Sequence, residues 1–372
     1  MTSLSPSPDF WRDREVLVTG HTGFKGSWLC LWLANLGAKI HGYALPPVFN
    51  QPGEIPLFVS ANVRSKLAAH WEADIRDSRL LAKVWNESGA TVLFHLAAQP
   101  LVRESYLSPY ETFEVNTLGT VAVLEALRLA NRPAAAVLVT TDKCYENLES
   151  VWSRRETDPL GGQDPYSASK SAAELTATAY RSSFFQAGSL AESPLVRLAT
   201  ARAGNVIGGG DWAIDRLAPD LARSLLGKKE AIIRNPRAIR PWQHVLEPLM
   251  GYIVLAERLW NEPENPSWRS AWNFGPDSLD LWPVSAVADA FCAAWGEGAN
   301  WLNVSDPNAP YESSFLSLCI DKAVQVLGWK PRWQTIDAVE RTALWYKNYG
   351  QTGFNAANAC ALEIQDYIAK SR

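Results

Sequence analysis

The sequence predicts an α/β fold in which a doubly wound parallel sheet is followed by a smaller C-terminal α/β lobe. Short apolar runs alternate with segments of helical periodicity over residues 15–199, as is typical of parallel strands covered by helices on both faces. This alternation weakens after residue 200, where prolines and tryptophans become frequent. We therefore expect one domain over 1–199 and a second unit mainly over 200–372, with residues 238–275 returning to the first domain.

The individual elements follow from composition and periodicity. Strands are expected where short aliphatic runs are bounded by Gly, Pro or polar residues, over 15–19, 39–43, 91–96, 136–140 and 195–199. Helices are expected where apolar residues recur at intervals of three and four, over 26–36, 77–87, 115–129 and 165–186. Residues 46–60 contain four prolines and are expected to form a loop. Each expected helix thus connects two expected strands.

The bulk composition argues against several classes of protein. The chain has 372 residues, a net charge of -4 and no basic run, so neither nucleic acid nor an anionic membrane is an expected partner. No apolar stretch reaches the roughly 18 residues of a membrane span, and residues 1–14 do not resemble a signal peptide. The five cysteines are widely spaced without a CxxC pair, which predicts neither disulfides nor a metal site. We expect a cytoplasmic protein.

A glycine-rich turn lies between the first expected strand and the first expected helix. Gly20, Gly23 and Gly26 have the spacing G-x-x-G-x-x-G, with Thr22, Phe24 and Lys25 between them. Glycines let backbone N–H groups approach a pyrophosphate, and the positive end of the helix favours its charge. The turn therefore predicts a Rossmann-type dinucleotide-binding domain.

The second strand leaves the choice between NAD and NADP open. An acidic residue usually binds the adenosine ribose at this point, but Tyr43 and Ala44 stand here instead. Because no arginine is present to bind a 2′-phosphate, we favour NAD. Asp74 and Ile75 are expected near the adenine, although Asp74 would equally well begin the helix at residue 77.

The strand over 136–140 and the helix that begins near residue 165 carry the candidate catalytic residues. Tyr166 and Lys170 are four residues apart, so they share one face of the helix. A lysine cation and a positive nicotinamide ring favour the phenolate, which makes Tyr166 a candidate general base. At the carboxyl end of the strand, where ligands bind in open parallel sheets, four polar residues follow in order: Thr140, Thr141, Asp142 and Lys143.

A third strand end carries small residues that would let a dinucleotide lie close to the backbone. The strand over 91–96 ends in Leu96, Ala97, Ala98 and Gln99. Tight packing alone would explain these residues equally well.

These residues together resemble the extended short-chain dehydrogenase/reductase family over nearly the whole chain. The resemblance rests on the glycine turn, residues 95–98, Asn116, the Tyr166/Lys170 pair, and residues 321–323 and 327–331. Within that family, several longer stretches look like the 4,6-dehydratases that act on CDP-glucose, namely 20–28, 98–103, 142–145, 202–212 and 239–245.

The resemblance implies a reaction on CDP-glucose without net oxidation. Tyr166, assisted by Thr141, takes the proton of the 4-hydroxyl while NAD accepts hydride from C4. The 4-keto group acidifies C5, Asp142 protonates the departing 6-hydroxyl, and the hydride returns to C6. Enzymes that act on dTDP-glucose carry a glutamate as the C5 base where this chain has Lys143, as the CDP-glucose enzymes do. The identity of the C5 base therefore stays open.

The resemblance also implies a nucleotide-binding set and a subunit interface. The residues expected at the sugar nucleotide are Gln99, Arg103, Thr141, Arg202, Asn205, Arg240 and His244, of which His244 fits a structural role equally well. In related enzymes the helices over 115–130 and 165–186 meet their twins in a four-helix bundle, which implies a homodimer or homotetramer. A 4-epimerase is the alternative activity, and a non-catalytic dinucleotide sensor is disfavoured because the Tyr-Lys pair is intact.

Overall fold

The computed structural model describes residues 4–147, 150–186, 195–305 and 314–370. A seven-stranded sheet of order β3-β2-β1-β4-β5-β6-β11 forms its centre, and every neighbouring pair is parallel. The strands are β1 (Glu15–Thr19), β2 (Lys39–Ala44), β3 (Leu67–Glu72), β4 (Val92–His95), β5 (Ala134–Val139), β6 (Val196–Ala203) and β11 (Ala271–Phe274). This order, which runs outward in both directions from β1, is that of the expected doubly wound sheet.

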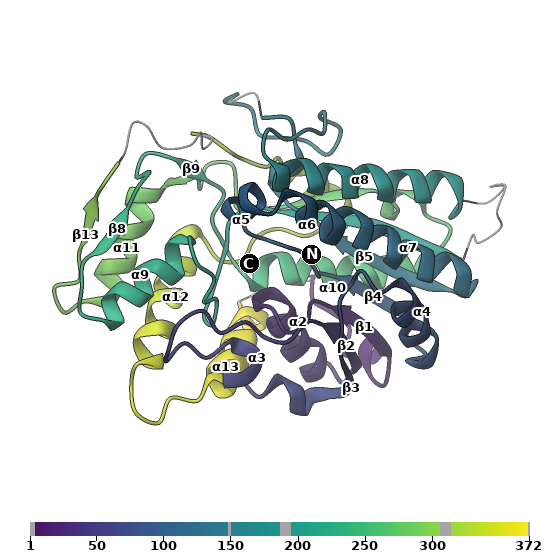
Figure 1. Ribbon diagram of the computed structural model, residues 1–372, viewed down its shortest axis with the longest axis horizontal. Coiled ribbons are helices and arrows are strands. Elements are labelled where there is room, and N and C mark those ends of the chain that lie inside the picture. The colour runs from purple at the N-terminus through teal and green to yellow at the C-terminus, as the bar shows by residue number, and fades with distance from the viewer. Residues whose placement is uncertain (1–3, 148–149, 187–194, 306–313, 371–372) are drawn as a thin grey trace.

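Helices cover both faces of the sheet because successive strand residues point to opposite sides. Val16 and Val18 of β1 pack on the face covered by α2 (Phe24–Asn35) and α10 (Leu246–Asn261), whereas Leu17 packs on the other. That second face carries α4 (Ser78–Glu87), α7 (Gly119–Ala130) and α8 (Pro165–Ser183) (Figure 1). Buried tryptophans such as Trp28 and Trp85 fill both layers.

The second unit lies beside the carboxyl edge of the sheet and is built from short strands and three helices (Figure 1). Its helices are α9 (Leu217–Leu226), α11 (Val284–Trp295) and α12 (Thr335–Tyr349). Its strands form three two-stranded pairs, which are β7 (Val206–Ile207) with β10 (Gln243–His244), β8 (Ala231–Ile233) with β13 (Trp301–Asn303), and β9 (Ile239–Arg240) with β12 (Trp282–Pro283).

Two segments after residue 200 belong to the first domain in space. Strand β11 extends the sheet beside β6, and α10 packs on β5 and β6; both lie within residues 238–275, the segment expected to return to the first domain. The C-terminal helix α13 (Ala356–Ala369) also returns, because it packs on α2 with the rings of Trp32 and Tyr367 5.6 Å apart. The sequence does not predict the return of α13.

Shorter helices complete the chain, and two of them differ from the sequence expectations. The short helices are α1 (Pro8–Trp11), α3 (Leu57–Ser60), α5 (Val102–Leu107) and α6 (Pro109–Phe113). The 3₁₀ turns are η1 (Val63–Lys66), η3 (Asp142–Cys144) and η4 (Pro266–Trp268). The segment 46–60 is not loop throughout, since α3 buries Leu57 and Phe58 in the core. The helix expected over 115–129 begins as a wide π-type turn, η2 (Glu114–Leu118), and a second such turn is η5 (Ala323–Leu327).

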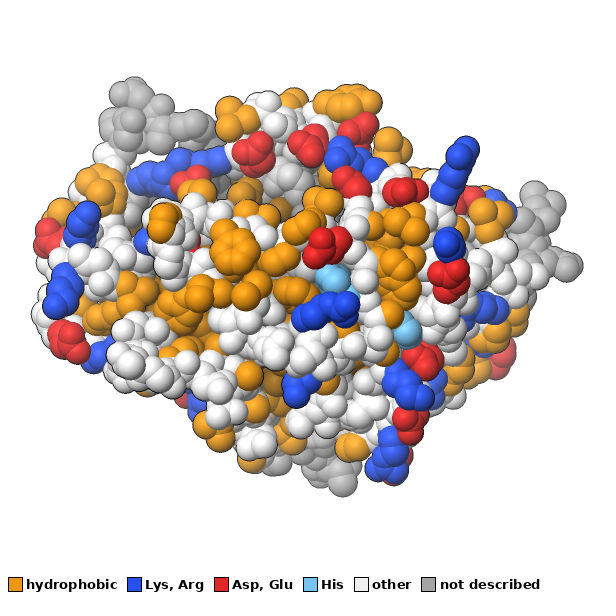
Figure 2. All heavy atoms as spheres, turned by 60° about the horizontal axis from the view of Figure 1, so that its bottom comes forward, with side chains coloured by type: hydrophobic (Ala, Val, Ile, Leu, Met, Phe, Trp, Pro, Cys, Tyr) orange, Lys and Arg blue, Asp and Glu red, His pale blue; other side chains and the backbone are white. Residues whose placement is uncertain are grey.

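The surface carries both signs of charge (Figure 2), and the helices are not of the membrane-spanning kind among the described residues. On the face shown in Figure 2, Lys and Arg side chains are interspersed with Asp and Glu among scattered hydrophobic side chains. Among the described residues, no helix is both long enough and apolar enough to cross a membrane.

Candidate active site

The glycine turn has the geometry that a bound pyrophosphate needs. Gly20 has a φ of 75°, and a Cβ there would lie 2.6 Å from the backbone nitrogen of Ala97 at the end of β4. A Cβ at Gly26 would collide with the carbonyl of Gly20, so only glycine lets α2 start this close to β1. Gly23 is the N-cap of α2 and supplies no side-chain cap, which leaves the first N–H groups of the helix for a ligand. The turn therefore fits a dinucleotide.

The remaining residues of this turn point in different directions. Thr22 donates to the carbonyl of Leu45 beyond β2, at 2.8 Å, and so ties the turn to the loop that follows the second strand. Phe24 lies against Gly208 of the second unit. Lys25 points toward the catalytic residues, because the charge of Asp142 acts on its ammonium, and burial lowers the pKa of Lys25 to about 8.

The residues expected near the adenine end lie on the carboxyl side of β3. Asp74 forms a two-pronged pair with Arg76, with Oδ2 2.6 Å from Nη2 and Oδ1 3.0 Å from Nε. Ile75 is buried against Gly119 at the start of α7. A role for Asp74 and Ile75 toward the adenine stays a prediction.

The strand ends of β4 and β5 carry the expected polar and small residues to one edge of the sheet. Leu96, Ala97, Ala98 and Gln99 are all half-buried just beyond β4. Asn116 connects this edge to α8, since its side chain donates to the carbonyl of Gln99 at 3.1 Å and to the hydroxyl of Ser169 at 2.9 Å. Gln99 itself folds back, with its amide donating to Leu101 and Thr112.

Tyr166, Thr141 and Asp142 come together where β5 faces the first turn of α8. Thr141 donates to Oδ1 of Asp142 at 3.0 Å, and the same side chain lowers the pKa of Tyr166. Asp142 is only 2% exposed, and its Oδ2 has no hydrogen-bond partner among the described residues. A buried carboxylate oxygen without a partner is costly unless a ligand or a proton satisfies it.

The protonation of these two groups follows from their burial. Burial raises the pKa of Asp142 above its ordinary value, although Lys143, Thr141, Arg240 and Lys25 all oppose the shift. Burial also raises the pKa of Tyr166 to about 12, against the lowering effects of Thr141 and Arg216. In the chain alone, burial outweighs these lowering effects, and the expectation that a lysine cation and a nicotinamide ring together favour the phenolate stays a prediction.

Lys170 lies one helical turn beyond Tyr166 and is almost fully buried. Burial lowers the pKa of Lys170 to about 8, and the carboxylate of Glu174, one turn further along α8, opposes that shift. The hydroxyl of Thr140 points away from Tyr166 and Asp142, since it donates to Glu174 at 2.5 Å.

A pocket opens beside this cluster on the side of the second unit. Its lining includes Val102 and Tyr106 of α5, Lys143 and Tyr145 after β5, Ser167 of α8 and Arg240 of β9. Lys143, a candidate catalytic residue, and Arg240, expected at the sugar nucleotide, thus line the same pocket, and their roles stay predictions. Arg103 is exposed at the rim and pairs with Asp215, while the backbone of Asn205 accepts from Gln243 at the base of the second unit.

Two expected substrate residues are instead structural. The guanidinium of Arg202 is 3% exposed and binds both oxygens of Glu174, at 2.9 and 2.8 Å, and the hydroxyl of Tyr145 at 2.7 Å. With its charge neutralised inside the protein, Arg202 is not available to a substrate phosphate. His244 is fully buried between the rings of Trp28 and Trp333, with Nε2 3.1 Å from Glu363, and so does not reach the pocket either.

One charged residue joins the site that the sequence does not single out. Arg216, at the N-cap of α9, pairs with Asp211 at 2.8 Å, and its charge acts on both Tyr166 and Lys25. No local motif marks Arg216, because the second unit brings it to Tyr166 only when the chain folds.

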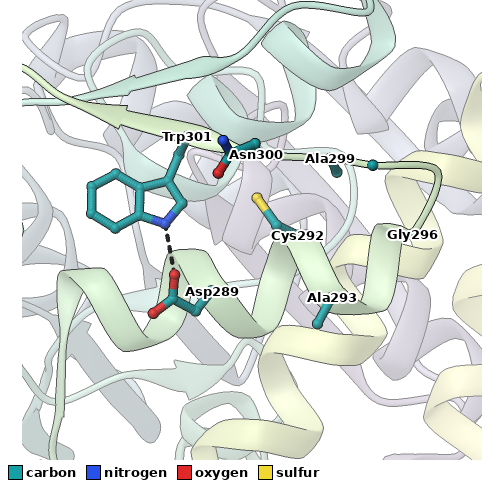
Figure 3. Close-up of a pocket in the computed structure, with 8 residues that line it drawn as sticks. Asp289, Cys292, Ala293, Gly296, Ala299, Asn300 and Trp301 are labelled. Atoms are coloured by element: carbon teal, nitrogen blue, oxygen red, sulfur yellow. Dashed lines mark hydrogen bonds between the residues drawn. The ribbon is translucent and has the colours of Figure 1, made fainter.

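A separate hollow lies on the second unit, between α11 and the segment that leads into β13. Figure 3 shows Asp289 of α11 facing Trp301, whose indole N–H donates to Asp289 at 2.8 Å, and the sulfur of Cys292 pointing toward Asn300. None of the candidate site residues lines this hollow. Among the described residues, no cluster of His, Cys, Asp or Glu has the composition of a metal site.

The fold and the site define an extended short-chain dehydrogenase/reductase, with a glycine turn, a Tyr-Lys pair and a polar strand end in one crevice. The chain belongs to the GDP-mannose 4,6-dehydratase family, whose model matches residues 17–258. It is 46% identical over 361 residues to the CDP-glucose 4,6-dehydratase of Salmonella typhimurium, a match that covers 97% of this chain and 98% of that protein. The dTDP-glucose 4,6-dehydratase of Streptomyces antibioticus is 27% identical, with 90% and 92% covered.

Solved structures share the same fold at lower identity. The UDP-glucose-4-epimerase of Stenotrophomonas maltophila, solved with NAD, matches with a TM-score of 0.75 and 21% identity, and the match covers 90% of this chain and 98% of that one. The dTDP-glucose 4,6-dehydratase of Streptomyces venezuelae, also solved with NAD, matches with a TM-score of 0.71 and 24% identity, with 89% and 96% covered. Both dehydratases and epimerases therefore occur on this scaffold.

Proposed function

We propose that the protein is an NAD-dependent lyase that converts CDP-D-glucose to CDP-4-dehydro-6-deoxy-D-glucose. The observation that carries this proposal is the buried carboxylate of Asp142, whose unpartnered Oδ2 lies beside the Tyr166 cluster. The 46% identity to the Salmonella CDP-glucose 4,6-dehydratase over almost the whole chain supports the choice of nucleotide.

The cofactor proposal rests on the fit of the glycine turn. Gly20, Gly23 and Gly26 would hold the pyrophosphate, with Ala97 close to the backbone of the dinucleotide. When bound, NAD would accept the hydride that leaves C4 of the sugar and later return that hydride to C6. No arginine directly follows β2, where Leu45 and two prolines stand, and this favours NAD over NADP.

Tyr166 is the proposed base for the 4-hydroxyl. A group whose pKa lies near 12 holds a proton at neutral pH, so Tyr166 must first give up that proton before its phenolate can accept the proton of the 4-hydroxyl. Thr141 donates a hydrogen bond to Asp142 and acts on Tyr166, so it is proposed to help orient both groups. The positive charge of Arg216 acts on Tyr166 and would stabilise the phenolate when it forms, and Lys170, one helical turn beyond Tyr166, is proposed to add to this effect.

Asp142 is the proposed acid for the elimination of water. Because burial raises its pKa, the carboxyl group of Asp142 takes up a proton more readily than an exposed one, and that proton would go to the departing 6-hydroxyl. Lys143 lines the pocket next to Asp142 and is the proposed base for the C5 proton. A 4-epimerase needs no acid at the 6-hydroxyl, so the burial of Asp142 favours the dehydratase over the epimerase.

We further propose that the protein is cytoplasmic and acts as a homodimer or homotetramer. All five cysteines are free in the structure and four of them are buried, which suits a reducing compartment. The helices α7 and α8 present large exposed apolar side chains, including Leu118 just before α7, Leu129 and Leu175, at 58%, 65% and 59% exposure. A second copy of the chain would cover this face.

The experiment is a mass spectrum of the product after incubation with NAD and CDP-glucose, with UDP-, dTDP- and GDP-glucose as parallel substrates. The proposal expects loss of one water from CDP-glucose without accumulation of reduced cofactor. An unchanged mass with inverted C4 would instead establish an epimerase, and inertness toward all four substrates would overturn the proposal.

A further inference from the structure

Three charged side chains meet where the two units face each other. Oδ1 of Asp215 lies 2.7 Å from Nη2 of Arg234, just after β8, and 3.4 Å from Nη1 of Arg103 on α5. The side chains of Asp215, Arg234 and Arg103 are 35%, 45% and 56% exposed, so a ligand can reach them. Asp215 has a φ of 61°, a left-handed conformation that few residues other than glycine adopt. This cluster therefore links the units through a constrained carboxylate.

The cluster borders the active site on both of its flanks. Asp215 directly precedes Arg216, whose charge acts on Tyr166. Arg103 directly follows Val102, which lines the pocket beside Lys143. The sugar reacts at C4, and its nucleotide is attached on the opposite side of the ring, at C1. A substrate whose C4 faces Tyr166 would carry its nucleotide away from Tyr166, and the exposed cluster, next in the chain to Arg216 and Val102, is the candidate to contact it.

The two carboxylate oxygens of Asp215 differ in their contacts. Both guanidinium groups contact Oδ1 of Asp215, and Oδ2 makes no hydrogen bond or ion pair within the described part of the chain. A free carboxylate acceptor thus stands beside the N–H donors of Arg234. Cytosine presents the complementary edge, because its 4-amino group donates while ring N3 accepts. Uracil and thymine present the opposite edge, because O4 accepts and N3–H donates.

We propose that Asp215 and Arg234 select the base of the nucleotide, with Oδ2 of Asp215 accepting from the 4-amino group of cytosine and Arg234 donating to N3. This inference rests on the proposed function and gives a physical reason for CDP rather than UDP or dTDP. Arg103 is a positioning residue in this arrangement, since it holds Oδ1 and leaves Oδ2 for the base. A site that matches a substrate's donors discriminates because the wrong base leaves polar groups unpaired.

The test compares kcat/KM for CDP-glucose and UDP-glucose in the wild-type protein and in Asp215→Asn and Arg234→Gln. The asparagine amide can donate to O4 of uracil, so we expect the preference for CDP-glucose to fall by about 10- to 100-fold in Asp215→Asn. The control is Arg237→Gln, which removes the same charge from an exposed position in the same loop and should leave the preference unchanged.

An equal loss of kcat/KM with both substrates would overturn the inference and assign the cluster to the diphosphate, which guanidinium groups also bind. An unchanged preference in both variants would overturn it as well. Calorimetric binding of CDP and UDP to the same variants separates this inference from the proposed function, because it needs no turnover. If the wild-type protein binds CDP more tightly than UDP and Asp215→Asn does not, base selection stands even for a protein that is not a dehydratase.

Discussion

Asp142 is the residue whose replacement best separates the two halves of the proposed reaction. Asp142→Asn removes the proton donor for the 6-hydroxyl but leaves Tyr166 to support oxidation at C4. We expect product formation to fall by about 10²- to 10⁴-fold, the usual contribution of a general acid. Oxidation without elimination should make reduced cofactor accumulate on the enzyme when CDP-glucose is added, which absorbance would detect.

The matched control for this experiment is Tyr166→Phe. It should also abolish product, but without any reduced cofactor, because the 4-hydroxyl then keeps its proton. If Asp142→Asn formed product at the wild-type rate, Asp142 would not be the acid. If neither variant accumulated reduced cofactor, oxidation at C4 would depend on Asp142 as well.

Among the residues of the site, the sequence predicts those that lie near one another along the chain. It does not predict those that come together only when the chain folds. Tyr166 and Lys170 share a helix face by spacing, and Asp142 follows a strand directly. Arg216 reaches Tyr166 from α9, and Arg202 is neutralised by Glu174, a residue 28 positions away. Neither contact leaves a pattern in the local sequence. The stretch 202–212 therefore predicts a substrate contact for Arg202, whereas the structure shows a buried ion pair with Glu174.

Helix α10 carries two buried carboxylates that tie both ends of the chain to the sheet. Glu257 accepts from the backbone N–H of Ser7 and the indole of Trp11, at 2.8 and 2.6 Å, both on Oε1. Glu247 accepts from Trp333 and from the hydroxyl of Tyr367, at 2.7 and 2.6 Å. Burial raises the pKa of each carboxyl group to about 7. These side chains therefore hold the N-terminal segment and α13 in place.

The raised pKa of Glu257 gives a pH dependence of stability with a definite sign. Between about pH 4.5 and 7 the folded state keeps a proton that the unfolded chain has released, so stability falls as the pH rises through that window. Glu257→Gln keeps Oε1 as an acceptor and removes the charge. We expect its free energy of unfolding to exceed that of the wild type by up to about 3 kcal/mol at pH 8 and to match it near pH 4.

Urea unfolding followed by tryptophan fluorescence at both pH values would measure this difference. Glu264→Gln, at an exposed position beyond the same helix, is the control and should change neither value. A stability for Glu257→Gln below that of the wild type at pH 8 would contradict the prediction, since it would mean that the ionised carboxylate is favourable in the folded state.

Elements that are buried on both sides were the ones the sequence predicted well. Strand β1 matches its expected bounds, and β4 and β5 lie within two residues of theirs, because uniformly apolar runs occur where helices cover both faces. Helix α3 was missed because prolines precede it, although Leu57 and Phe58 reach the core. The return of α13 depends on long-range contacts such as Trp32 with Tyr367, which periodicity does not reveal.

The whole molecule leaves one broad apolar face that a second copy of the chain would bury. Helices α6, α7 and α8 pack side by side, and their outer surfaces carry Tyr110, Leu129 and Leu175 at 77%, 65% and 59% exposure. Single exposed apolar residues are ordinary, whereas exposed apolar residues on several helices that pack together are a candidate interface. This face is opposite the one that packs on the sheet, so association would not obstruct the crevice at Tyr166.

We therefore expect sedimentation velocity to show a dimer or tetramer at micromolar concentration. Leu129→Glu with Leu175→Glu places unpaired carboxylates at the centre of the proposed interface, which should shift the protein to monomers because burying such charges is costly. Val48→Glu with Phe49→Glu is the matched control on a different exposed apolar segment, where both side chains are mainly exposed. A wild-type protein that sediments as a monomer, or a dimer that only the control variant disrupts, would place the interface elsewhere. Since α8 carries both Tyr166 and Leu175, loss of turnover in the monomeric variant would show that the interface also holds the catalytic helix in position.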